Sequence, residues 1–178
     1  MGSAASPRDG VDLPHGVVLP VPQPGEVWVV GAVIRDPAGR IFIQRRTASR
    51  RLFADSWDLV GGHRDPGEPI LEALAREITE ETGWALSRIV ASLGVMEYTG
   101  DDGVARREMD FLVEVDGDLD HPVLEHGKHE QPRWITRDQV AELLRERRPG
   151  EDLVQGILES AFEWLDAHRG HADGPGAD

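Results

Sequence analysis

The chain has 178 residues, contains no cysteine and carries a formal net charge of −14. This length suits one domain with a substantial core, and the lack of cysteine excludes disulfides, a thiolate nucleophile and a thiolate metal site. The acidic balance argues against a nucleic-acid polymer as partner, because no surplus of Lys and Arg is left to neutralise phosphates. A small phosphate ester remains compatible, since a metal ion can bridge carboxylates to phosphate oxygens.

The sequence also predicts no membrane partner. No stretch approaches membrane-spanning length. The apolar segment at residues 16–21 is short, contains Pro20 and lacks a basic flank, so it does not have the pattern of a signal peptide. With no cysteine present, we expect a reducing, cytoplasmic location.

The first half of the chain predicts an arm followed by strands. Residues 1–24 hold five prolines and predict a mostly extended arm. The apolar run 27–34 predicts a buried strand. A turn at 36–39 and the apolar residues 41–43 then predict a hairpin between this strand and the next. Residues 57–60 predict a short strand that leads into Gly61 and Gly62.

The second half alternates strands and helices. Two strands are expected at residues 89–98 and 108–115, joined by a turn at 100–103. A short strand at 134–135 precedes a helix over 137–147, and an amphipathic helix follows over 153–168. We therefore expect one domain over residues 25–169 and a loose polar tail over 170–178. Strands mixed with helices favour a mixed sheet between helical layers.

The most informative segment is residues 62–84, GHRDPGEPILEALAREITEETGW. Pro69 suits the first position of a helix, where a missing N–H costs nothing. Gly83 suits a left-handed cap at the helix end. Between them an apolar stripe recurs at helical spacing and predicts the buried face. Its members are Leu71, Leu74, Ile78 and Thr82.

Carboxylates crowd the same helix. Glu77, Glu80 and Glu81 are three and four residues apart, and we expect them to share a face that points away from the apolar stripe. Such a cluster repels itself unless a cation lies in it, and hard oxygen ligands favour Mg²⁺ or Mn²⁺. Arg76 can hold one carboxylate by a bidentate pair, and Glu68 can complete its orientation.

This segment resembles the Nudix box, the signature of the Nudix hydrolases. The matching positions are Gly62, Glu68, Arg76, Glu77, Glu80, Glu81 and Gly83, with Ile78 at the bulky apolar position. The resemblance implies cleavage of a nucleoside diphosphate linked to another group, with Mg²⁺ as cofactor and Mn²⁺ as substitute. It also implies an α/β/α sandwich with a mixed β-sheet, the Nudix fold, over roughly residues 26–147. Trp84 stands where the family usually has an aliphatic residue.

The resemblance implies further site residues outside the box. Gly61 occupies the position whose backbone carbonyl often completes the metal shell, and Arg46 the position of an arginine that contacts substrate phosphate. The loop 124–130 corresponds to a segment that often supplies another glutamate, for which we expect Glu130 ahead of Glu125. Stacking on a nucleobase is assigned to Trp134, although core packing is the commoner role of such an aromatic. The histidines of this loop are interpreted as loop residues without a metal.

Two other functions deserve comparison with the hydrolase. Residues 44–63 resemble the isopentenyl-diphosphate isomerase branch of the family, but the chemistry of that branch uses a cysteine, which this chain lacks. The second alternative is a catalytically silent domain that senses a nucleotide. Since all the catalytic glutamates are present, we rank it below the enzyme. A homodimer is expected only on general grounds, and the substrate could be a nucleoside triphosphate, a nucleotide sugar or a dinucleotide.

Overall fold

Strand β1 (Trp28–Ile34) is buried along its whole length, because it lies inside a four-stranded sheet that is covered on both faces. In the computed structural model, which describes residues 11–169, the order of this sheet is β4–β1–β6–β5. Its other strands are β4 (Val60–His63), β5 (Ala85–Thr99) and β6 (Ala105–Asp116). Strand β1 runs parallel to β6 and antiparallel to β4, so the sheet is mixed, as predicted.

A second sheet is antiparallel, in the order β3–β2–β7. It consists of β2 (Ile41–Arg46), β3 (Trp57–Asp58) and β7 (His129–Ile135). The predicted hairpin between the first two strands is wrong, since β1 and β2 belong to different sheets and share only an isolated bridge between Arg35 and Ile41. Both edges of β1 are occupied by β4 and β6, so β2 has no edge on which to pair.

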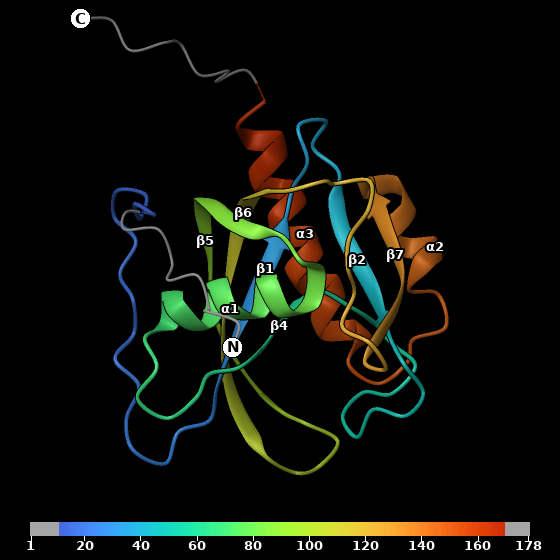
Figure 1. Cartoon of the computed structure of the whole chain (residues 1–178). Coiled ribbons are helices and arrows are strands. Elements are labelled where there is room, and N and C mark those ends of the chain that lie inside the picture. Colours follow the sequence, from blue (N-terminus) through green and yellow to red (C-terminus); the bar gives the residue numbers. More distant parts are fainter. Residues whose placement is uncertain (1–10, 170–178) are drawn as a thin grey trace, which may run out of the picture.

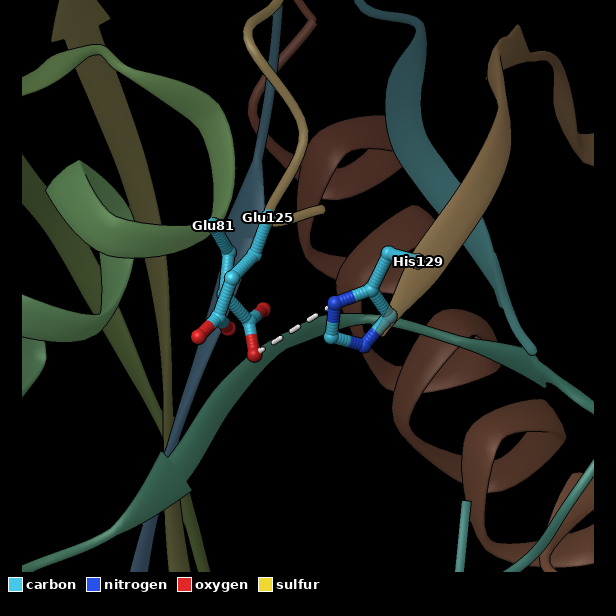
Figure 2. Close-up of side chains that lie close together, drawn as sticks. All are labelled: Glu81, Glu125 and His129. Carbon is cyan, nitrogen blue, oxygen red and sulfur yellow. Dashed lines mark ion pairs between the residues drawn. The ribbon is translucent and has the colours of Figure 1, made fainter. Parts of the chain in front are cut away.

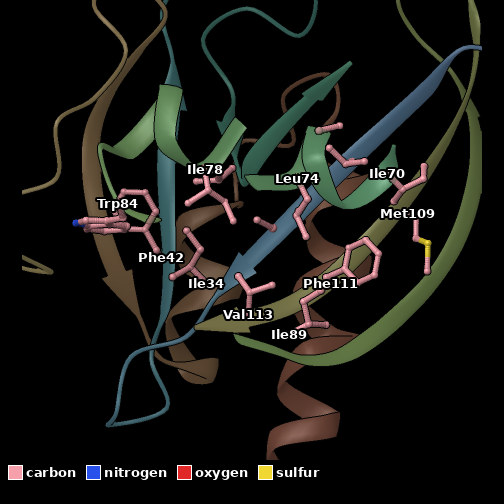
Figure 3. Close-up of a cluster of buried hydrophobic side chains, with 14 of the residues drawn as sticks. Ile34, Phe42, Ile70, Leu74, Ile78, Trp84, Ile89, Met109, Phe111 and Val113 are labelled. Atoms are coloured by element: carbon pink, nitrogen blue, oxygen red, sulfur yellow. The ribbon is translucent and has the colours of Figure 1, made fainter. Parts of the chain in front are cut away.

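Helices cover opposite faces of the four-stranded sheet (Figure 1). Helix α1 (Ile70–Thr82) packs its Leu74 and Ile78 against Phe111 and other side chains of one face, as Figure 3 shows. Helix α3 (Glu151–Ala167) packs its Leu158 against Leu112 of the other face. Neighbouring residues of β6 thus enter different cores, which is the alternation expected of a strand. The α/β/α prediction is confirmed.

The helix predicted over residues 137–147 is shorter than expected. A single 3-10 turn, η1 (Arg137–Gln139), is followed by a four-residue helix, α2 (Val140–Leu143). Among residues 11–169, no helix has the length and apolar character that crossing a bilayer requires.

The arm is extended, as far as the structure describes it, but it is not separate from the core. Residues 11–24 form no helix or strand, and they run beside β5, in blue in Figure 1. Val11, Leu13, Val17 and Leu19 pack against the core on the α1 side of the sheet. The predictions for residues 1–10 and for the tail at 170–178 lie outside the described residues.

Candidate active site

The carboxylates of α1 do not share one exposed face. Glu77 and Glu81 are buried, with relative exposures of 8% and 4%, whereas the side chain of Glu80 is 48% exposed. The expectation that all three point away from the apolar stripe is therefore wrong. Glu77 lies three residues after the buried Leu74, and Glu81 lies four residues after Glu77. Residues at these spacings share one face of a helix, so both glutamates turn towards the interior.

The two glycines of β4 make room for these carboxylates. A Cβ atom on Gly62 would lie 2.5 Å from the carboxylate of Glu77, and one on Gly61 would lie 2.3 Å from the carbonyl oxygen of Val30. The N–H of Gly61 donates a hydrogen bond to Oε2 of Glu81 at 3.1 Å. Any larger residue at either position would displace a carboxylate or separate the paired strands.

Arg76 fixes the position of Glu77. Its Nε and Nη2 donate to the two carboxylate oxygens of Glu68 at 2.8 and 2.9 Å, while Nη1 donates to Glu77 at 2.8 Å. A further bond from Nη2 reaches the carbonyl oxygen of His63 at 3.1 Å. The hydrogen bonds from Arg76 hold the pKa of Glu68 below its ordinary value. By contrast, burial raises the pKa of Glu77, and Arg76 only partly offsets this.

Glu81 lies at the centre of a small cluster of potential metal ligands. Its Oε2 accepts a hydrogen bond from Nε2 of Gln44 at 2.8 Å, and its Oε1 lies 3.9 Å from Nδ1 of His129. Glu125 joins them, and one ligand atom from each of Glu81, Glu125 and His129 lies within 4.8 Å of the others (Figure 2). Burial and the nearby charge of Asp58 raise the pKa of Glu81 well above its ordinary value. A divalent cation would offset that cost, so these residues fit one.

The structure places Glu125, and not Glu130, beside the box helix. His129, the first residue of β7, is buried, and Glu130 next to it is exposed. Because successive side chains of a strand point to opposite faces, Glu130 turns away from Glu81. The preference for Glu130 is corrected on this ground. The sequence predicted His129 to be a loop residue, whereas it is the buried first residue of β7.

His129 is a neutral imidazole at physiological pH. Burial, followed by the charges of Arg46, Arg50 and Lys128, lowers its pKa to about 3. Neither ring nitrogen has a hydrogen-bond partner within the described part of the chain. The unprotonated ring nitrogen of His129 therefore has a lone pair that could bind a metal ion.

Arg46 and Trp134 have different surroundings. Arg46 donates to the carbonyl oxygen of Leu52 and to Asp58, at 2.8 and 2.9 Å, and lines a cavity. Trp134 instead stacks on Trp84 with a centroid distance of 5.8 Å, and it meets Phe42 edge to face. Trp134 does not line the cavity. It packs in the core, and this position does not support the stacking of a nucleobase on its ring.

The cavity has a volume of about 440 Å³ and reaches the glycines beside the carboxylates. Its apolar wall includes Val29, Leu59 and Ile157, and cationic side chains line another part. The cations are Arg46, Arg50, Arg51 and Lys128. Nε of Arg50 is buried and has no hydrogen-bond partner within residues 11–169. An anionic group in the cavity could accept a hydrogen bond from this unsatisfied donor.

A pair of hydrogen-bonded acids, Glu108 and Asp110, adjoins the cavity, which Glu108 lines together with Tyr98. Burial and then the charge of Asp58 raise the pKa of Glu108 to about 7. Burial and Glu108 raise the pKa of Asp110 well above its ordinary value. Asp110 fits only because residue 31 is glycine, where a Cβ would lie 1.9 Å from Oδ1 of Asp110. The sequence analysis missed this pair, although two acids at alternate positions of an apolar strand were a visible signal.

Comparisons with known proteins agree with this geometry. The model of the NUDIX domain family matches residues 26–155. An uncharacterized Nudix hydrolase of Streptomyces coelicolor is 36% identical over 147 residues, which are 80% of this chain and 75% of the relative.

Two further similarities are more limited. An m7GpppN-mRNA hydrolase of Xenopus laevis is 35% identical over 94 residues, which are 52% of this chain and only 30% of the relative. The crystal structure of a MutT protein from Methanosarcina mazei Go1 has a TM-score of 0.62 at 22% identity, covering 79% of this chain and 95% of that protein. At this identity the second likeness concerns the fold alone.

Proposed function

The chain belongs to the Nudix hydrolases, enzymes that cleave pyrophosphate bonds, and from this premise we propose that it cleaves a nucleoside diphosphate linked to another group. The products are a nucleoside monophosphate, or its counterpart, and the rest of the substrate. The observation that carries the proposal is that Glu77 and Glu81 lie next to a cavity. Gly62 contacts Glu77, Gly61 donates a hydrogen bond to Glu81, and both glycines line the cavity. Carboxylates for a cation thus adjoin space for a nucleotide.

We assign the cation to Glu77, Glu80, Glu81 and the backbone of Gly61, together with Glu125 from the loop before β7. Mg²⁺ or Mn²⁺, when bound there, supplies charge neutralisation of the phosphates and a lowered pKa of a water molecule. Glu68 and Arg76 position Glu77 through the bidentate pair. Glu125 replaces Glu130 as the candidate for a further ligand or a general base, since its carboxylate lies in the cluster.

The cavity supports an anionic substrate of nucleotide size. Its volume of about 440 Å³ lies within the range of small-molecule sites. The basic side chains at its edge compensate locally for the net charge of −14, so that Arg46 and Arg50 can receive phosphates. The name of the Xenopus relative supports a nucleotide substrate, whereas the acidic surface still favours a small nucleotide over a long RNA. A cytoplasmic location and a homodimer stay predictions from the sequence.

A product analysis tests this function. The purified chain is incubated with nucleoside triphosphates, nucleotide sugars, dinucleoside polyphosphates and a short capped RNA, with Mg²⁺ or Mn²⁺, and products are identified by mass. A matched pair of variants controls for contaminants, namely Glu81→Gln in the cluster and Glu72→Gln on the exposed side of α1. We expect turnover that Glu81→Gln abolishes and Glu72→Gln leaves intact. Nucleotide binding without any turnover would support the sensor instead.

A further inference from the structure

We infer that His129 is a direct nitrogen ligand of the divalent cation, alongside Glu81 and Glu125, and that the site consequently favours Mn²⁺ over Mg²⁺. The inference shares its site with the proposed hydrolysis, but it concerns metal binding and can be tested without substrate.

The first argument is the unsatisfied state of His129. Its side chain is 0% exposed, and neither Nδ1 nor Nε2 has a hydrogen-bond partner within the described residues. A buried polar group without a partner loses its hydrogen bonds to water and gains none in the folded chain, which destabilises that chain. Its Nδ1 faces Oε1 of Glu81 at 3.9 Å, which is too long for a hydrogen bond. An ion between the two atoms would satisfy both.

The second argument is the convergence of three elements on one point. Glu81 lies in the last turn of α1, Glu125 lies in the loop before β7, and His129 begins that strand. Their ligand atoms are within 4.8 Å of one another, and Figure 2 shows the three side chains directed towards the same space. Bonds of about 2.1 Å to one ion place two ligands at most roughly 4.2 Å apart. A small movement of these side chains towards one another would therefore allow all three to bind one ion.

The loop holds Glu125 and His129 in a fixed relation. The backbone N–H groups of Lys128 and His129 both donate to the carbonyl oxygen of Glu125, at 3.1 and 3.2 Å. Gly127 inside this turn has φ +74°, a conformation that favours glycine. Lys128 forms an ion pair with Oε1 of Glu125, so Oε2 is the oxygen assigned to the cation.

The donor set determines the preferred ion. Mg²⁺ takes oxygen ligands in a nearly octahedral arrangement. Mn²⁺ also prefers oxygen ligands, but as the first member of the divalent transition-metal series it binds an imidazole nitrogen more readily than Mg²⁺ does. Two carboxylates and one imidazole form a mixed set of oxygen and nitrogen ligands. When a nitrogen ligand replaces an oxygen ligand, the affinity of the site for Mn²⁺ falls less than its affinity for Mg²⁺. The same set gives no support to a thiolate-type zinc site, since the chain has no cysteine.

Pulsed electron paramagnetic resonance on the full chain loaded with Mn²⁺ tests the inference, because a bound imidazole nitrogen adds a hyperfine coupling to the Mn²⁺ signal. The variants are His129→Gln and the matched control His126→Gln, an exposed histidine of the same loop. We expect the nitrogen coupling in wild type and His126→Gln and its loss in His129→Gln. Titration should show Mn²⁺ affinity reduced by at least about 10-fold in His129→Gln, with a smaller change for Mg²⁺.

Absence of nitrogen coupling in the wild-type spectrum, or its persistence in His129→Gln, would overturn the inference. Thermal melts in EDTA check that each variant folds, and His129→Asn provides a second substitution if glutamine does not fit. The outcome is separable from the proposed function. Nitrogen coupling without turnover of any nucleotide would contradict only the hydrolase, and turnover without nitrogen coupling would contradict only the role of His129.

Discussion

Glu77 lies so close to Gly62 that a Cβ atom added at residue 62 would be 2.5 Å from its carboxylate. Ordinary Cβ contacts are longer than 3.0 Å, so a methyl group at this position must displace either β4 or Glu77. Because Arg76 holds Glu77 from the other side at 2.8 Å, the carboxylate has little freedom to move. The glycine is thus a requirement of the candidate cation site.

Replacing Gly62 by alanine should therefore reduce kcat strongly, by about 10²-fold, since removal of one electrostatic group from an active site has an effect of that size. Gly156→Ala is the matched control. Gly156 is exposed in α3 with open space around its Cβ position, so this variant should keep its activity and gain about 0.5–1 kcal/mol of stability from helix propensity. Steady-state kinetics and thermal melts measure both. Unchanged turnover in Gly62→Ala would show that the position of Glu77 does not matter.

Glu81→Gln should lower kcat by about 10²–10³-fold, because the amide keeps the shape of the side chain but loses the charge that holds a cation. In EDTA the same variant should melt at a higher temperature than wild type, because burial makes the charged form of Glu81 costly in the folded chain. Glu72→Gln supplies the comparison for both measurements. A lower melting temperature for Glu81→Gln would mean that the hydrogen bonds from Gln44 and Gly61 outweigh the burial of charge.

Glu125→Gln and Glu130→Gln should differ in effect, although the two residues lie in one short segment. Glu125 belongs to the cluster around Glu81, and Glu130 is exposed on β7. We expect kcat to fall by at least about 10-fold for Glu125→Gln, a typical loss at a metal site, and to stay near the wild-type value for Glu130→Gln. The measurement is kcat at saturating cation. The reverse order of effects would restore the expectation drawn from the sequence.

The contribution of Glu108 to the stability of the metal-free chain should fall as pH rises from about 4.5 to about 7. Glu108 has an ordinary pKa of 4.5, which burial raises to about 7 in the folded state. Whereas the lowered pKa of His129 adds stability as pH rises through much of this range, Glu108 holds more protons in the folded chain than in the unfolded chain, so its ionisation favours unfolding as pH rises. Asp110 acts in the same direction, since its pKa is also raised by burial.

Denaturant titrations in EDTA across this pH range measure the slope. Glu108→Gln should remove the negative contribution of Glu108 to this slope, because the amide cannot ionise, whereas the exposed Glu97→Gln should leave the slope unchanged. The raised pKa of Glu81 contributes to the slope with the same sign as Glu108, and it does so equally in the wild type and in both variants. The same dependence of stability on pH in Glu108→Gln as in the wild type would contradict the burial of Glu108 as a cause.

Removing residues 1–22 should lower the melting temperature while kcat stays within about twofold. Leu13, Val17 and Leu19 pack against the core, and losing the burial of each should cost up to about 1.5–3 kcal/mol. Within residues 11–22, the part of the arm that the structure describes, no residue lines the cavity beside the carboxylates. A large fall in kcat with an unchanged melting temperature would show that the arm contributes to the site.

The sequence by itself determined the family, the mixed α/β architecture and the helix that carries the glutamates. Helix α1 ends at Gly83 in the left-handed conformation, with φ +74°, as its sequence predicts. Its start is displaced by one residue, since Pro69 is the N-cap and not the first helical residue. Such features depend on residues within a few positions of each other, and one sequence displays them in full.

Only the tertiary structure decided which distant segments meet. The separation of β1 from β2 follows from the occupation of both edges of β1 by strands far away in the chain. The choice of Glu125 and His129 over Glu130 depends on the point at which β7 begins, because a shift of one residue turns every side chain to the other face. The approach of Asp110 to Gly31 likewise depends on the register of the parallel pair β1–β6. Register is set by packing across the whole core, and local sequence does not encode it.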